Sequence, residues 1–225
     1  MANCNICPRK CNVDRSLKTG VCGVSDTLKI ARAALHFWEE PCISGTKGSG
    51  TVFFSGCNMK CVFCQNYEIS TGCFGKEITT ARLREIYNEL IEQGAHNINL
   101  VTPTHYAEKI LESLENPISV PVVYNSSGYD SVDTLKKFEG KVQIYLPDMK
   151  YAFSSLAKKY SLAPDYPERA KEAIREMFRQ TGEAVFDDDG IMKKGVIIRH
   201  MMIPDNTDNT LDVIGEEFVD SKVLE

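Results

Sequence analysis

The sequence has 225 residues, of which 43% are hydrophobic and 25% are charged, and its formal net charge is -5 at pH 7. A chain of this size and apolar content can bury the core of one domain. The acidic balance, with no stripe of Lys and Arg, argues against a general nucleic-acid surface and against an anionic-membrane surface.

The N-terminus lacks the basic and apolar regions of a leader peptide, and no run of about 18 apolar residues follows. We therefore expect a cytoplasmic protein with no membrane span and no nucleic-acid partner. The nine cysteines are an odd number and lie in clusters. Clustered cysteines in a reducing compartment favour metal ligation over disulfides.

Residues 1–23 carry the first cysteine cluster, in the pattern CxxCxxxCx(10)C, formed by Cys4, Cys7, Cys11 and Cys22. Four thiols are a complete ligand set for zinc, for mononuclear iron or for an iron-sulfur cluster, and uncoordinated reduced thiols are the alternative. A segment this short buries too little apolar surface to fold alone, so a metal would supply its folding energy. We expect residues 24–50 to form a linker that packs on the core, with His36 as either a hydrogen-bonded core residue or a ligand.

The second cysteine cluster follows an apolar run that begins at Thr51 and a turn at Gly56. Its three cysteines are Cys57, Cys61 and Cys64, with the spacing CxxxCxxC. A zinc site would need a fourth ligand, for which Cys42 and Cys73 are the nearby candidates. An iron-sulfur cluster held by three thiolates keeps one iron open to an outside ligand, and we predict such a cluster here.

After this loop, predicted strands alternate with amphipathic helices. Strands are predicted at 97–101, 120–124, 142–146 and 196–203. Helices are predicted from Thr79 or Thr80 to Gly94, from Thr104 to before Pro117, from Ser131 to Gly140, over 166–180, and around Leu211, Ile214 and Phe218. With the strand that precedes Cys57 there are five β units, which predicts an α/β fold with a parallel sheet, a partial (β/α) barrel over residues 51–225.

Polar side chains follow each predicted strand, at the edge where parallel barrels gather functional groups. They are Thr102, Asn125, Ser127, Asp148, Lys150 and Arg199. Hydroxyl, amide, carboxylate and cationic groups are what a zwitterionic cofactor with a ribose requires. In the alternative interpretation Asp148 and Lys150 are an exposed ion pair worth less than about 1 kcal/mol. Arg199 lies in an apolar run and should need a partner or an anionic ligand, whereas His105 and His200 stay ambiguous.

The spacing CxxxCxxC, with Phe63 before the last cysteine, resembles the signature of radical S-adenosylmethionine (SAM) enzymes. The whole chain is similar to the activating-enzyme branch of that superfamily, which includes pyruvate formate-lyase activating enzyme, and in particular to its uncharacterised relatives with an N-terminal cysteine cluster. The shared segments are Cys7-Pro-Arg-Lys-Cys11, His36-Phe-Trp-Glu-Glu-Pro41, Ser49-Gly-Thr-Val-Phe-Phe-Ser-Gly-Cys57 and Cys64-Gln-Asn-Tyr-Glu-Ile69.

The resemblance implies a 4Fe-4S cluster that chelates S-adenosylmethionine and cleaves it reductively to a 5'-deoxyadenosyl radical, which abstracts hydrogen from a substrate. Phe63 would lie near the adenine, Asp148 and Lys150 would contact the methionyl end, and Arg199 would lie near the same cofactor. The implied partners are a glycyl radical enzyme as substrate and a flavodoxin- or ferredoxin-like electron donor. A small-molecule radical enzyme and a non-catalytic iron-sulfur or zinc protein are the alternative functions.

This chain differs from the family pattern in three places. Thr102-Pro103-Thr104 stands where many members have Gly-Gly-Glu, so recognition of the cofactor's amino group should differ. The segment 125–128 stands where activating enzymes often have Asp-Thr-Asn-Gly, which puts a bound cation in doubt. The sixth β unit of the family core is missing, so we expect a C-terminally truncated chain with an open edge strand.

Overall fold

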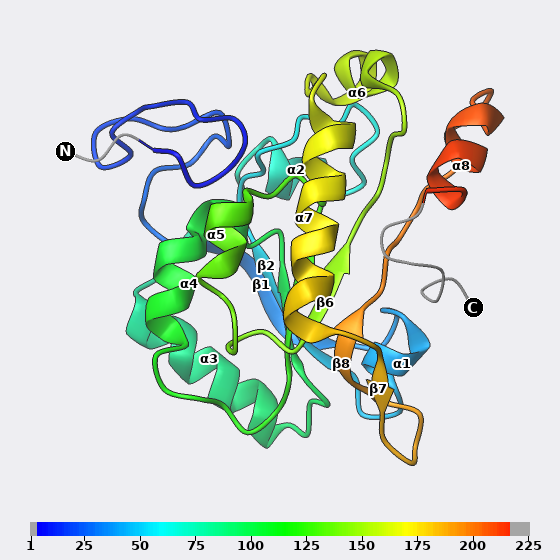
Figure 1. The fold of residues 1–225 in the computed structure, drawn as a ribbon. Coiled ribbons are helices and arrows are strands. Elements are labelled where there is room, and N and C mark those ends of the chain that lie inside the picture. Colours follow the sequence, from blue (N-terminus) through cyan, green and yellow to red (C-terminus); the bar gives the residue numbers. More distant parts are fainter. Residues whose placement is uncertain (1–3, 217–225) are drawn as a thin grey trace.

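A computed structural model describes residues 4–216, which form an α/β fold around one mixed sheet (Figure 1). The sheet has eight strands in the order β3-β1-β2-β4-β5-β6-β8-β7. Their bounds are β1 Lys29–His36, β2 Ser49–Phe54, β3 Lys76–Glu77, β4 Ile98–Val101, β5 Val122–Ser126, β6 Ile144–Pro147, β7 Val185–Phe186 and β8 Met192–Val196.

Strands β2, β4, β5, β6 and β8 are parallel neighbours, which confirms the five predicted β units. The sheet as a whole is neither all-parallel nor closed, because β1, β3 and β7 add antiparallel pairs at its two edges. The expected open edge stays a prediction, because β7 pairs only with the beginning of β8 and the sheet is not closed.

The predicted strand at 196–203 was wrong in its bounds, since β8 ends at Val196. Pairing with β6 nevertheless continues, because Ile197 and Arg199 donate backbone N–H groups to the carbonyl oxygens of Tyr145 and Pro147, each at 2.9 Å. Arg199 thus stays aligned with the end of β6 without lying in a regular strand.

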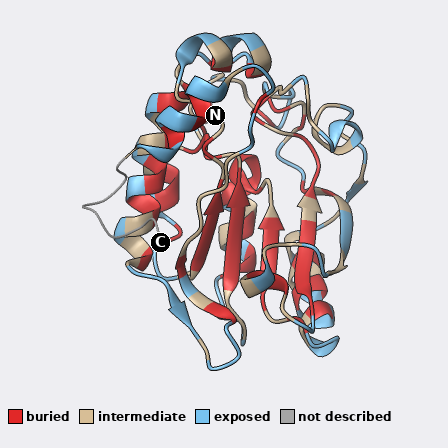
Figure 2. Cartoon of the chain, turned by 90° about the vertical axis from the view of Figure 1, so that its right-hand side faces the viewer, coloured by how far each residue is buried: buried red, intermediate tan, exposed pale blue. Residues whose placement is uncertain are grey.

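The helices pack mainly against one face of the sheet, and Figure 1 shows α3, α4, α5 and α7 on that side. Their bounds are α1 Pro41–Ser44, α2 Tyr67–Ser70, α3 Thr80–Glu92, a 3-10 turn Thr104–Tyr106 followed by α4 Ala107–Ser113, α5 Val132–Lys136, α6 Ser154–Ser161, α7 Tyr166–Thr181 and α8 Thr207–Ile214. The central strands are buried along most of their length, and the helices bury their inner faces (Figure 2).

The ends of α3 form as predicted. The Thr79 hydroxyl accepts the N–H of Arg82 at 3.1 Å, and Gly94 follows the helix with a positive φ of 92°. Ser131 occupies the N-cap position of α5, as the predicted helix start implies, but its side chain makes no capping hydrogen bond. The predicted helix around Leu211 exists as α8, although Leu211 and Ile214 are exposed; Phe218 lies outside the described residues.

Residues 28–38, within the predicted linker, contain β1, which pairs antiparallel with β2. The predicted linker therefore contains a strand of the sheet, and the chain that leaves β1 reaches the mouth of the cavity described below. Residues 4–28 contain no helix or strand. Within residues 4–216, no helix is long and apolar enough to cross a membrane.

Candidate functional site

The loop that follows β2 carries the three cysteines predicted to bind the cluster. Gly56 turns the chain with a positive φ of 86°, and a hydrogen-bond partner lies beside each thiol. The N–H of Met59 donates to Cys57 Sγ at 3.4 Å. The Ser161 hydroxyl donates to Cys61 Sγ at 2.9 Å, and the Ser70 hydroxyl lies 3.2 Å from Cys64 Sγ. Hydrogen bonds to cysteine sulfurs are one means by which proteins tune iron-sulfur clusters.

The three thiols line a cavity of about 570 Å³, a size typical of cofactor sites. All seven residues predicted to bind the cofactor line the same cavity: Phe63, Thr102, Asn125, Ser127, Asp148, Lys150 and Arg199. The ends of the parallel strands thus bring together the residues that the sequence places after each strand. Their roles toward a cofactor stay predictions.

A network of charged groups spans one wall of this cavity. Arg199 Nε donates to Asp148 Oδ1 at 3.1 Å, and Lys150 Nζ donates to Asp148 Oδ2 at 2.5 Å. The Asp148 and Lys150 side chains are only 21% and 16% exposed, so they are not a plain surface pair. Burial lowers the pKa of Lys150, but the negative charges of Asp148 and Cys61 outweigh burial and raise it overall.

Glu39 is a member of this network that the sequence analysis missed. Its Oε1 accepts from Arg199 NH1 at 3.0 Å. Its Oε2 accepts from the side-chain amides of Asn99 at 3.0 Å and Asn125 at 2.9 Å. Arg199 NH2 in turn donates to Asn125 Oδ1 at 2.7 Å. Glu39 lies in the segment 36–41 that carries the family resemblance, which was the one signal that could have identified it.

The strand exit at 102–104 is a place where this chain differs from the family pattern that it resembles. Thr102 has a left-handed backbone with φ 59°, a conformation that glycine adopts readily and β-branched residues rarely do. The Thr104 hydroxyl is not directed to the cavity, because it donates to buried Asp130 at 2.7 Å. Asp130 also accepts from the hydroxyls of Ser126 at 2.6 Å and Tyr124 at 3.0 Å, which ties two strand exits together.

The histidines take different places. His36 lines the cavity, with its ring edge-on to Phe53. His200 is bound to the Met149 carbonyl at 2.6 Å and to the Thr210 hydroxyl at 3.0 Å, so it holds the chain together outside the cavity. His105 is buried, and its Nε2 contacts the Ser55 carbonyl at 2.8 Å.

The donor set fits an iron-sulfur cluster. Within the described residues, no three Cys, His, Asp or Glu side chains are arranged to hold one metal ion. A single zinc would require sulfurs about 2.3 Å from a common point, whereas each thiolate of a four-iron cluster binds a separate iron. Burial raises the pKa of Cys57 to about 12, so metal binding there must displace a proton.

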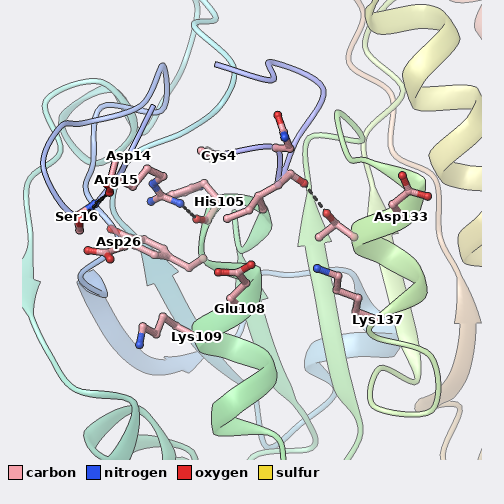
Figure 3. Close-up of a pocket in the computed structure, with 14 residues that line it drawn as sticks. Cys4, Asp14, Arg15, Ser16, Asp26, His105, Glu108, Lys109, Asp133 and Lys137 are labelled. Atoms are coloured by element: carbon pink, nitrogen blue, oxygen red, sulfur yellow. Dashed lines mark hydrogen bonds between the residues drawn. The ribbon is translucent and has the colours of Figure 1, made fainter. Parts of the chain in front are cut away.

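A larger cavity, of about 660 Å³, lies between the N-terminal segment and the helices α4 and α5 (Figure 3). Its lining mixes acids such as Asp14, Asp26 and Glu108 with the cations Lys109 and Lys137. It contains none of the three cysteines after β2. We therefore place the candidate active site in the cavity beside Cys57.

Comparison with known proteins finds similarity over most of the chain. Residues 51–217 match the sequence profile described as "Radical SAM superfamily". The chain is also 30% identical, over 215 residues, to an uncharacterized protein of Methanocaldococcus jannaschii. That similarity covers 92% of this chain and 58% of the relative, so the chain spans less than two thirds of the relative's length.

Proposed function

This chain belongs to the radical SAM superfamily, and we propose that it is an activating enzyme that removes a hydrogen atom from a glycine of a partner protein. When bound, the 4Fe-4S cluster and S-adenosylmethionine supply hydrogen abstraction through a 5'-deoxyadenosyl radical. A flavodoxin- or ferredoxin-like protein is the proposed electron donor, and a glycyl radical enzyme is the proposed substrate.

We assign binding of the cluster and of S-adenosylmethionine to side chains that line the cavity. Cys57, Cys61 and Cys64 bind three irons as thiolates. Lys150 and Arg199 offer cations to the carboxylate of the methionyl group, and the aromatic face of Phe63 suits the adenine. Asn125 and Ser127 offer hydrogen bonds to hydroxyl groups. Thr102 offers its hydroxyl and its backbone carbonyl to the same cavity.

The observation that carries the choice of a protein substrate is the exposure of apolar side chains that directly follow cavity residues in the chain. Phe37 and Trp38 follow the cavity residue His36 and are 52% and 89% exposed. Met202 follows the cavity residue Met201 and is 74% exposed. The ion pair between Glu39 and Arg199 draws these two segments together. Exposed aromatic and methionine side chains favour a protein partner, whereas small molecules are commonly enclosed.

The first experiment tests the superfamily chemistry in this chain. The protein is reconstituted anaerobically with iron and sulfide, then given S-adenosylmethionine and dithionite, and 5'-deoxyadenosine is measured by chromatography. We expect 5'-deoxyadenosine from the native chain and from Cys42→Ala, whose cysteine lies outside both clusters, and none from Cys61→Ala. Absence of product from a fully loaded native chain would contradict cleavage by this chain.

The second experiment tests the substrate class. Cells of the source are grown on glycine deuterated at the α carbon, and their extract is separated by size into macromolecules and small molecules. Each fraction is added to the reaction, and deuterium in 5'-deoxyadenosine is measured by mass spectrometry. Deuterium from the macromolecular fraction supports an activating enzyme. Deuterium from the small-molecule fraction alone would instead identify a small-molecule radical enzyme.

A further inference from the structure

Arg15 is a buried cation for which the described part of the chain supplies no anion. The residue is 6% exposed, and its two terminal NH groups donate to the carbonyl oxygens of His105 and Ser25. Within residues 4–216, no carboxylate oxygen lies within 4.0 Å of its guanidinium, and its Nε has no hydrogen-bond partner. Burying a charge without a counter-charge lowers the stability of a fold by several kcal/mol. We therefore expect an anion beside Arg15 that the described side chains do not provide.

A small cavity lined by Arg15 is the place where we expect this anion. Its lining includes the four N-terminal cysteines, which are Cys4, Cys7, Cys11 and Cys22. Arg9, Arg15 and His105 line the same cavity. A Cβ built on Gly20 would lie 3.3 Å from the sulfurs of both Cys11 and Cys22, so these two thiols flank the same glycine. Four cysteines that are scattered over 19 positions of sequence thus surround one point in space.

Two further buried polar groups border this cluster. The Tyr106 hydroxyl is buried and has no hydrogen-bond partner. The Arg15 guanidinium lies 5.7 Å from the centre of the Tyr106 ring. His105 cannot balance Arg15, because an imidazole ring is either neutral or positively charged; burial lowers its pKa to about 3, so the ring is neutral here.

We propose that Cys4, Cys7, Cys11 and Cys22 bind a second iron-sulfur cluster as thiolates and that Arg15 is its buried counter-cation. Among the described residues that line this cavity, Arg15 Nε and His105 Nδ1 are buried and have no hydrogen-bond partner. Zinc bound by the same four thiolates would also be anionic, so the iron and sulfide content of the reconstituted protein decides between the two. Iron-sulfur clusters with four thiolates are anionic and bind each sulfur at a separate iron.

This cluster uses none of the cysteines of the candidate active site, so iron analysis can test it independently of catalysis. The full chain with Cys57→Ser, Cys61→Ser and Cys64→Ser is reconstituted anaerobically with iron and sulfide. We expect about four iron and four sulfide per chain, with roughly twice as much in the native protein. Adding Cys4→Ser and Cys11→Ser should remove the remaining iron.

Either of two results would overturn the proposal: a folded triple variant that binds no iron, or one that binds a single zinc per chain in place of a cluster. Folding is checked by circular dichroism. If the triple variant does not fold, the reciprocal variant decides the question. Cys4→Ser with Cys11→Ser in the otherwise native chain should lose about half of the iron, and unchanged iron content would refute the site.

The role of Arg15 is tested by the reduction potential of the N-terminal cluster, measured by dithionite titration with electron paramagnetic resonance in the triple variant. Reduction adds negative charge, so removal of a neighbouring cation should lower the potential. We expect a lower potential in Arg15→Met, recovery in Arg15→Lys, and no change in Lys18→Met, which removes an exposed charge of the same segment. An unchanged potential in a folded Arg15→Met protein would show that Arg15 serves only packing.

Discussion

Cys57 donates its backbone N–H to the carbonyl oxygen of Cys22 at 3.1 Å, so the two cysteine clusters meet through one hydrogen bond. Arg9 adds a second link, since its Nε donates to the Asn58 carbonyl at 2.8 Å. The N-terminal segment therefore supports the backbone of the loop that carries the predicted catalytic cluster. Loss of order around Cys22 should therefore weaken the backbone hydrogen bond of Cys57.

We predict that Cys22→Ser accelerates amide exchange at Cys57. If the N-terminal segment loses its metal, the hydrogen bond from Cys57 weakens, and a bond worth about 1 kcal/mol corresponds to roughly fivefold faster exchange. Hydrogen-deuterium exchange of the peptide that contains Cys57 measures this effect. Cys42→Ser is the matched control and should leave exchange unchanged. Equal protection in Cys22→Ser and the native protein would contradict the coupling.

A second prediction concerns Glu39, which holds Arg199 and Asn125 in place. Glu39→Gln removes the negative charge that Arg199 faces, and a hydrogen bond to a charged group is worth about 1.5–3 kcal/mol. We expect binding of S-adenosylmethionine to the reconstituted protein to weaken roughly ten- to a hundredfold. Equilibrium dialysis under anaerobic conditions measures this affinity.

Glu40→Gln provides the control for Glu39, because it makes the same chemical change one residue away, outside the network around Arg199. Its affinity for S-adenosylmethionine should equal that of the native protein. If Glu39→Gln and Glu40→Gln bound the cofactor equally well, Glu39 would have no part in shaping the site.

The local part of the fold could be predicted from the sequence. Alternating strands and helices placed the five parallel strands, and parallel topology then gathered Asp148 and Arg199 at one edge. What could not be predicted depends on long-range pairing. The run at 28–38 becomes a strand only because β2 pairs with it, and that pairing alone carries Glu39 to Arg199, 160 positions away. The burial of Arg15 could likewise not be predicted from the sequence, because it depends on the tertiary fold.

A third prediction concerns the pH dependence of stability through Asp130. Burial raises the pKa of this carboxyl group above its ordinary value, although hydrogen bonds from Ser126, Thr104 and Tyr124 act in the opposite direction. The folded state therefore binds the proton more tightly than the unfolded chain does. The stabilisation from protonated Asp130 is complete below the unfolded pKa of about 3.9 and is lost as the pH rises through the raised folded pKa.

Asp130→Asn removes this titration while keeping the size of the side chain. The stability of Asp130→Asn relative to the native protein should therefore be higher at pH 7 and should fall as the pH is lowered toward about 4. Urea unfolding over this pH range measures the difference. Asp188→Asn, at an exposed position, should show no such trend. A difference for Asp130→Asn that stays constant with pH would contradict the assignment.

The last prediction concerns Gly128, which turns the chain after β5 with a positive φ of 76°. A Cβ at this position would lie 2.2 Å from the Asp148 carbonyl oxygen, so Gly128→Ala must displace the segment that carries Asp148. Gly140 is a matched control, because its φ is 77° and nothing lies within 4 Å of a Cβ there. Gly140→Ala should lower the free energy of unfolding only by the left-handed backbone penalty, about 1–2 kcal/mol.

Gly128→Ala should lower the stability measured by thermal unfolding by more than this. It should also weaken binding of S-adenosylmethionine, because Asp148 orients Arg199 and Lys150. Equal losses of stability in the two variants, with cofactor affinity unchanged, would show that the Asp148 segment tolerates displacement and does not set the geometry of the site.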